Sequence, residues 1–74
     1  MPTNMEPYQE RVVVEKDALD KKIRDLTFFI KTSPVCATLE PIEQVRLTEQ
    51  SDVMRRYSQI LDERIAAFRR VAED

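Results

Sequence analysis

Glycine is absent from all 74 residues of the chain, so no position inside its long periodic segments favours a break in a helix. Proline sets the boundaries instead. The first helix must stop before Pro34, because the residue that precedes a proline avoids the helical region. We therefore predict helices over about residues 5–31 and 41–72, joined by a connection over residues 32–40. The valine run at residues 12–14 is too short, among helix-forming neighbours, to predict a strand.

The two predicted helices begin in the same way. Asn4 is suited to cap the first helix, with Glu6 and Pro7 in its first turn, where a proline costs little and a carboxylate faces the positive helix end. The same arrangement returns at residues 38–41. A connection this short makes the two helices antiparallel neighbours. The predicted fold is all-α, an antiparallel two-helix hairpin that forms a single domain over residues 1–74.

A hairpin of this length buries little surface by itself. Chains of this size rarely stabilise a core without disulfides, a metal or association. Cys36 is the single cysteine and histidine is absent, which excludes an intrachain disulfide and the usual soft zinc sites. We interpret Cys36, in its apolar setting, as a small packing residue rather than a nucleophile. Association with other copies is the remaining way to bury the exposed apolar residues, and we expect a homo-oligomer.

Two lines of residues run along the first predicted helix. One line is apolar at spacings of three and four, and consists of Val12, Leu19, Ile23, Leu26 and Ile30. The line beside it has a spacing of seven, and consists of Tyr8, Glu15, Lys22 and Phe29. An aromatic ring and an ammonium group that border an apolar line indicate a recognition surface rather than a reaction centre.

The second predicted helix also carries an apolar line with alternating spacings of three and four. Its members are Leu47, Gln50, Met54, Tyr57, Leu61, Arg64, Phe68 and Val71, flanked by Arg46, Val53, Ile60 and Ala67. Most of these residues are typical of coiled-coil packing, but Gln50, Tyr57 and Arg64 are polar where a purely structural hairpin prefers Leu or Ile. A charge inside an apolar line needs a partner. For Arg64 that partner is either a carboxylate of a neighbouring copy (Glu43, Asp62 or Glu63) or a ligand phosphate.

The charge pattern and the residue types exclude several functions. Twelve basic and 14 acidic residues are interleaved along both helices, which disfavours a surface for DNA or RNA polymers. No apolar run is long enough to span a bilayer, and we expect no membrane partner. Without histidine the chain lacks a general base suited to neutral pH, and its carboxylates form no metal-binding pattern. We expect no enzymatic activity, no metal and no cofactor.

Three side chains of the first helix are suited to bind an anionic ligand. Tyr8 offers a flat ring for a purine, Lys22 a charge for phosphate, and Arg11 lies on the same side as Tyr8. The alternative is that Tyr8 is an amphipathic residue at a helix start and Lys22 a solvated charge. These two residues lie about 21 Å apart along a helix, so one chain cannot close both around one small ligand. Two chains that cross antiparallel near Glu15 would bring Tyr8 of one opposite Lys22 of the other.

Several motifs along the chain resemble one known family. They are P-Y-Q-x-R-V over residues 7–12, E-K-x-x-L-D-x-K-I over 15–23, L-T-x-F-I over 26–30, E-Q-x-x-L over 43–47 and M-x-x-Y-S-x-I-L-x-x-R-I over 54–65. With these motifs the chain resembles the phage anti-CBASS cyclic-nucleotide sponges, whose hairpin domain also occurs in some Thoeris anti-defence proteins.

The resemblance implies a homo-hexamer that sequesters cyclic dinucleotides such as 3′,3′-cGAMP between subunits without cleaving them. Some members also hold cyclic trinucleotides near a threefold axis. The family's dinucleotide-binding tyrosine and lysine correspond to Tyr8 and Lys22. The arginine of its trinucleotide site corresponds best to Arg64, with Arg46 as the rival. Such a protein would block CBASS immune signalling in the cytoplasm of the infected bacterial host.

Two other functions compete with a cyclic-nucleotide sponge. A helical protein–protein interaction module would dock a partner helix along the line from Leu47 to Val71, and is favoured if the isolated protein is a monomer or dimer. A phosphodiesterase that cleaves the same nucleotide is disfavoured, because the chain lacks histidine and metal-ligand patterns.

Overall fold

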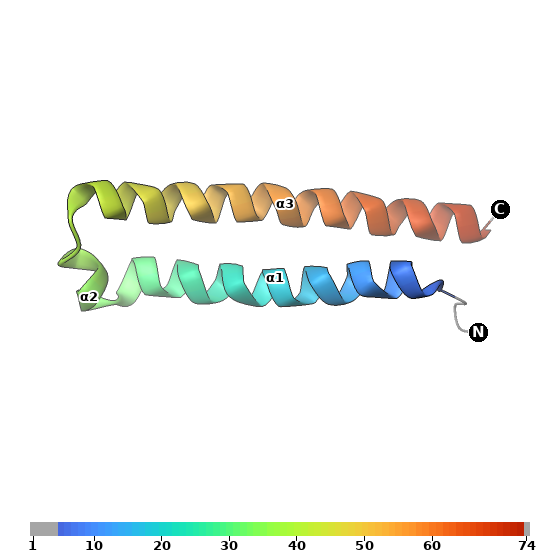
Figure 1. Ribbon diagram of the computed structural model, residues 1–74, viewed down its shortest axis with the longest axis horizontal. Helices are drawn as coiled ribbons and strands as arrows, with labels where there is room; N and C mark the ends of the chain where they lie inside the picture. The colour runs from blue at the N-terminus through green and yellow to red at the C-terminus, as the bar shows by residue number, and fades with distance from the viewer. Residues whose placement is uncertain (1–4, 74) are drawn as a thin grey trace.

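Two long helices and one short helix make up the described chain. The computed structural model describes residues 5–73, with side chains over residues 5–68. The helices are α1 (Pro7–Thr32), α2 (Pro34–Ala37) and α3 (Pro41–Glu73). Helices α1 and α3 lie side by side and run in opposite directions, with α2 at the end where the chain turns (Figure 1). Over the described range the chain forms helices and no strand, which confirms the all-α prediction.

The start of α1 differs from its predicted form. Residues 5 and 6 precede the helix, and Glu6 rather than Asn4 occupies the N-cap position. The backbone N–H of Glu6 donates to the Gln9 side-chain oxygen (2.9 Å), and the Glu6 carbonyl accepts from Gln9 and Glu10. A glutamine three residues after the cap satisfies the cap's own N–H, as in a capping box. The predicted cap, Asn4, lies outside the described residues, and the observed cap, Glu6, is two residues later.

The connection between the long helices is itself ordered by side chains. Helix α1 ends at Thr32, and the Ser33 side chain then accepts from the backbone N–H of Val35 (3.1 Å), which caps the four-residue helix α2. Cys36 is buried in this turn, in agreement with its interpretation as a packing residue. The Gln44 side chain donates to the Leu39 carbonyl (2.9 Å) and ties the turn to the first part of α3.

The face of α1 that meets α3 was predicted correctly. Val12 and Leu19 are buried, and Ile23, Leu26 and Ile30 are partly buried. The described residues therefore place this whole apolar line of α1 against α3, with Val12 and Leu19 in the core cluster.

The face of α3 that meets α1 differs from the predicted line. We call this face the inner seam, and its residues are Leu47, Ser51, Met54, Ser58, Leu61, Ile65 and Phe68, all buried or partly buried. Gln50, Tyr57 and Arg64, predicted inside the line, are exposed. The side chain of Val71 lies outside the described range. The predicted and the observed lines share Leu47, Met54, Leu61 and Phe68. The observed line contains two buried serines, Ser51 and Ser58, where the predicted line has Gln50 and Tyr57.

The residues that directly precede those of the inner seam form what we call the outer face of α3. They are Arg46, Gln50, Val53, Tyr57, Ile60, Arg64 and Ala67, which again alternate at spacings of four and three. All of them except Ala67 are exposed, and Val53 is exposed to 68%. Helix α3 thus carries a second face, on which Val53, Tyr57 and Ile60 remain exposed in the hairpin.

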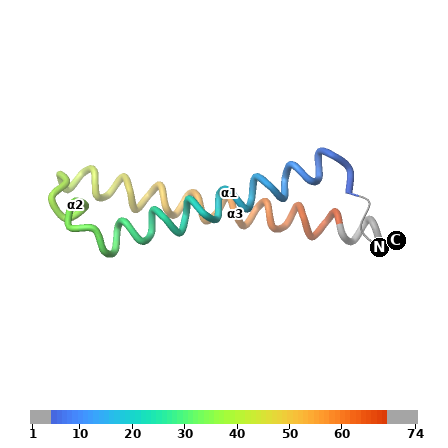
Figure 2. Tube along the Cα trace, turned by 90° about the horizontal axis from the view of Figure 1, so that it is seen from below, coloured from blue at the N-terminus to red at the C-terminus, as the bar shows by residue number. Residues whose placement is uncertain are grey.

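The hairpin is elongated. Its principal extents are 52 × 17 × 16 Å, and the radius of gyration is 16.5 Å, compared with roughly 11 Å for a compact domain of this length. Figure 2 shows α1 and α3 crossing near their middles. The accessible surface is 5823 Å², whereas a compact monomer of 8.7 kDa exposes roughly 4,700 Å². No helix among the described residues is long and apolar enough to cross a membrane.

Candidate ligand-binding surface

Tyr8 lies in the first turn of α1, close to the last described side chain of α3. Its ring meets the Phe68 ring edge to face, with centroids 5.8 Å apart and planes at 80°. Such pairs stabilise a defined ring orientation. The Tyr8 side chain is nevertheless 51% exposed. The structure therefore unites the two interpretations of Tyr8, since the ring packs against α3 and still offers surface to a ligand.

Arg11 lies one turn further along α1 and lines a shallow groove, which we call the α1 groove. The other lining residues are Pro7, Glu10, Val14 and Glu15, and the volume is about 540 Å³. This volume lies in the range of small-molecule sites. All five lining residues belong to α1, so the groove has one wall. A ligand that is enclosed there needs a second wall from another molecule.

Lys22 is exposed on α1, two turns beyond Glu15 on the line that begins at Tyr8. At 1.5 Å per residue, the 14 residues from Tyr8 to Lys22 span about 21 Å. One chain therefore does not bring these two side chains together. Neither Lys22 nor Arg11 belongs to an ion pair among the side chains that the structure describes. Both cations are available to an anionic ligand.

Arg64 and Arg46 both lie on the outer face of α3, 18 residues or about 27 Å apart along the helix. Arg64, predicted inside an apolar line of the second helix, is exposed in the hairpin. Arg46 is also exposed, and its Nη1 lies 3.5 Å from Glu43 Oε1. Of the two, Arg46 already has a carboxylate partner.

Sequence reasoning missed a polar cluster between the helices. Lys16 Nζ donates to Asp20 Oδ2 (2.9 Å) and to Ser58 Oγ (3.0 Å), and Ser58 Oγ donates to Asp20 Oδ1 (2.5 Å). These bonds lower the pKa of Asp20, through Ser58 first and Lys16 second, and raise the pKa of Lys16 through its bond to Asp20. The signal in the sequence is Lys16, a basic residue at the core-facing spacing between Val12 and Leu19.

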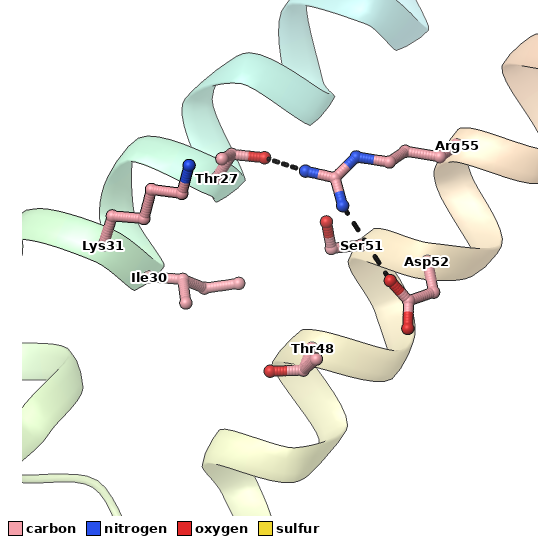
Figure 3. A pocket seen from close by; sticks show the side chains of 7 residues that line it. All are labelled: Thr27, Ile30, Lys31, Thr48, Ser51, Asp52 and Arg55. Atoms are coloured by element: carbon pink, nitrogen blue, oxygen red, sulfur yellow. Dashed lines mark hydrogen bonds and ion pairs between the residues drawn. The ribbon is translucent and has the colours of Figure 1, made fainter.

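A smaller pocket lies between α1 and α3 near the α2 end, and we call it the Arg55 pocket. Its lining residues are Thr27, Ile30, Lys31, Thr48, Ser51, Asp52 and Arg55 (Figure 3). None of them was predicted to form a site. The sequence contains little indication of this pocket, because its hydroxyl side chains come from two separate helices and lie near each other only in the folded hairpin.

The described side chains offer no obvious reaction centre. No group of three or more His, Cys, Asp or Glu side chains is placed to hold a metal ion within the described range. The free thiol of Cys36 is buried in the turn. What the described geometry provides is a ring, a one-walled groove and unpaired cations, which are features of binding rather than of bond cleavage.

These features define a small helical binding protein. A family model described as Sequestin matches residues 6–67, and the chain belongs to the Sequestin family. No curated protein and no solved structure matches the chain. The family name agrees with the resemblance to sequestering proteins found in the sequence motifs, and it indicates binding of a ligand rather than catalysis.

Proposed function

We propose that this protein sequesters cyclic dinucleotides, such as 3′,3′-cGAMP, between copies of the chain and releases them unchanged. The observation that carries the proposal is the half-exposed Tyr8 ring beside a groove that α1 alone walls. Membership of the Sequestin family supports a sequestering role. The resemblance to anti-CBASS sponges supplies the ligand class and the setting, in which a phage protein blocks CBASS signalling in its bacterial host.

The second wall of the pocket comes from a second copy. An antiparallel crossing of two α1 helices near Glu15 places Tyr8 of one copy opposite Lys22 of the other. A base then stacks on Tyr8, while Lys22 and Arg11 approach the phosphates. Neither cation has an ion-pair partner among the described side chains, which supports this assignment.

The surface of the hairpin supports self-association independently of the ligand. The accessible area exceeds that of a compact monomer by roughly 1,100 Å². Val53, Tyr57 and Ile60 lie exposed at coiled-coil spacing on the outer face of α3. Burial of this face by further copies would assemble the homo-oligomer, which the family resemblance puts at six chains.

Association through the outer face would also give Arg64 a role. A cation brought into an apolar contact between copies requires a counter-charge. The phosphates of a cyclic trinucleotide would supply that charge, so we assign the second, trinucleotide site to Arg64. Arg46 is the weaker candidate because Glu43 already neutralises it.

The proposal is tested by isothermal titration with 3′,3′-cGAMP, beside a light-scattering mass. Tyr8→Ala should weaken binding by about tenfold or more, since stacking on an aromatic ring contributes roughly 1–3 kcal/mol per base. Tyr8→Phe keeps both the stacking surface and the contact with Phe68, and should bind within a few-fold of the wild type. Equal loss of binding in both variants would assign the effect to the Tyr8 hydroxyl and contradict stacking, and loss of the oligomer in Tyr8→Ala would make Tyr8 a packing residue.

Lys22 has a matched control beside it in the chain. Lys21 is exposed and pairs with Asp25 (2.9 Å), away from the line that contains Tyr8. Lys22→Ala should weaken binding strongly and Lys21→Ala should not. Recovery of the intact nucleotide after heating the complex would exclude cleavage. A protein that gives no heat with either cyclic dinucleotides or trinucleotides, and is a monomer or dimer, would instead fit the helical interaction module.

A further inference from the structure

The Arg55 pocket is a small hollow between the two long helices, in which polar side chains stand on a largely apolar lining. Thr27, Ile30 and Lys31 line it from α1, and Thr48, Ser51, Asp52 and Arg55 line it from α3 (Figure 3). Its volume is about 130 Å³. One water needs roughly 10–15 Å³ of such space, and sites for drug-sized ligands start at about 300 Å³. The pocket therefore has room for a small ion and is too small for a nucleoside.

Arg55 spans the pocket from α3 to α1. One terminal nitrogen, Nη2, donates to Thr27 Oγ1 (2.9 Å), which fixes the direction of the guanidinium (Figure 3). The other, Nη1, lies 3.8 Å from Asp52 Oδ1, a long contact between two exposed groups. A guanidinium carries five N–H donors, so most of its donors stay free in this arrangement. Those donors are held in place by the bond to Thr27.

The remaining polar side chains of the pocket are one ammonium group, one carboxylate and the hydroxyls of Thr48 and Ser51, of which the Thr48 hydroxyl already donates to the Gln44 carbonyl (3.2 Å). Ser51 is 4% exposed and lines the pocket from α3. Lys31 is exposed and belongs to no described ion pair. Two cations face one carboxylate, Asp52, which leaves the lining with one excess positive charge.

We propose that the Arg55 pocket binds a single phosphate group, held by Arg55 and Lys31 and by the hydroxyl of Ser51. Guanidinium, ammonium and hydroxyl donors on two helices suit the several acceptor oxygens of a tetrahedral oxyanion. Thr27 and Tyr8 are 19 residues apart on α1, about 28 Å along the helix, so this site is separate from the proposed dinucleotide surface. The phosphate is either free inorganic phosphate or one phosphate of a bound nucleotide.

The experiment is a ¹H–¹⁵N NMR titration of the full chain with inorganic phosphate, at constant ionic strength and with chloride as the reference. We expect saturable shifts of the Arg55 side-chain N–H and of the amides around Thr27 and Ser51. Arg55→Gln should weaken phosphate binding by about tenfold, because it removes a charge-assisted donor. Asp52→Asn should tighten binding several-fold, because it removes a repelling carboxylate that competes for Arg55.

Arg56 provides the matched control for Arg55. It lies next in the chain, bonds to Gln59 (3.1 Å) and does not line the pocket. Arg56→Gln should leave phosphate binding unchanged. Equal weakening by the two glutamine variants would reveal only nonspecific attraction of anions, and would overturn the proposal.

A parallel titration with a cyclic dinucleotide separates the two sources of phosphate. If the Arg55 signals shift with inorganic phosphate and not with the nucleotide, the ligand is the free ion. If they shift only with the nucleotide, and this shift is lost in Arg55→Gln, the ligand is a phosphate of the nucleotide. No saturable shift at Arg55 with either ligand overturns the proposal. The result does not depend on the dinucleotide surface, since Tyr8→Ala should weaken nucleotide binding there and leave inorganic phosphate bound at Arg55.

Discussion

The inner seam and the outer face of α3 have the same alternating spacing, but they differ in residue type and in surroundings, since the outer face includes Arg46, Gln50 and Arg64. Leu61 in the inner seam is 1% exposed, whereas its neighbour Ile60 on the outer face is 40% exposed. The inner seam also contains Ser58 and its bonds to Lys16 and Asp20, which fix how the helices align. On the outer face of α3, apolar residues alternate with the same spacing but meet no partner within the described chain. The comparison indicates that one face specifies the hairpin and the other is available for association.

The largest expected effect on folding comes from Leu61→Ala. It removes the most buried side chain of the core cluster and should lower the free energy of unfolding by about 3 kcal/mol, through lost transfer energy and a cavity. Urea denaturation followed by circular dichroism measures it. If Ile60→Ala were as destabilising at the same low protein concentration, the distinction between the two faces would fail.

The next effect tests the polar part of the inner seam. Asp20→Ala leaves Lys16 and Ser58 without their carboxylate partner, and should cost about 2 kcal/mol of unfolding free energy. Asp17→Ala is the control, because Asp17 is exposed on the same helix and belongs to no described ion pair. Equal stability of the two variants would show that the cluster contributes nothing to the alignment of the helices.

The cluster of Lys16, Asp20 and Ser58 should also make the free energy of unfolding depend on pH, with a smaller effect than the Asp20→Ala substitution. The pKa of Asp20 is lowered from 3.8, so its contribution is complete above that pH and is lost as the pH falls through the folded value. The pKa of Lys16 is raised from 10.5, so its contribution is complete below that pH and is lost as the pH rises through the folded value. Thermal unfolding from acid to alkaline pH should show both losses, and Asp20→Asn should flatten the acid limb relative to the wild type.

The smallest effect on hairpin folding should come from a charge on the outer face. Ile60→Asp should change the unfolding free energy of the dissociated hairpin by about 0.5 kcal/mol or less. It should nevertheless lower the mass measured by light scattering, because a carboxylate is buried when copies associate. Ala66→Asp adds the same charge at an exposed position off the outer face and should keep the wild-type mass. An unchanged mass for Ile60→Asp would place the association surface elsewhere.

Much of the fold was predictable from the sequence, because it depends on local rules. The absence of glycine, the position of Pro34 and the Glu-Pro starts determine where helices run and end. The inner register of α3 was not predictable in this way. Two lines of residues on α3 share the same four apolar members and could each face α1. One adds Ser51, Ser58 and Ile65, and the other adds Gln50, Tyr57 and Arg64. Contacts with α1 decide which line is buried. Ser58 fits that contact because Lys16 and Asp20 reach it across the helices.

The candidate surface was predictable only for side chains on one helix. The line through Tyr8 and Lys22 follows from helix periodicity, as does their separation along α1. The contact of Tyr8 with Phe68 and the Arg55 pocket join residues that are far apart in the sequence, so they depend on how α1 and α3 align. No sequence pattern within either helix encodes such a pairing.

The central claim is that each nucleotide pocket takes Tyr8 from one copy and Lys22 from another. The most direct test mixes two chains that should each fail to bind alone, Tyr8→Ala and Lys22→Ala, co-expressed with different tags and titrated with 3′,3′-cGAMP. In a mixed antiparallel pair, one pocket combines the intact Tyr8 with the intact Lys22, so random pairing should restore about one quarter of the wild-type sites. If the mixed oligomer forms and binding is not restored, the pocket does not span two copies in this way, and the account is contradicted.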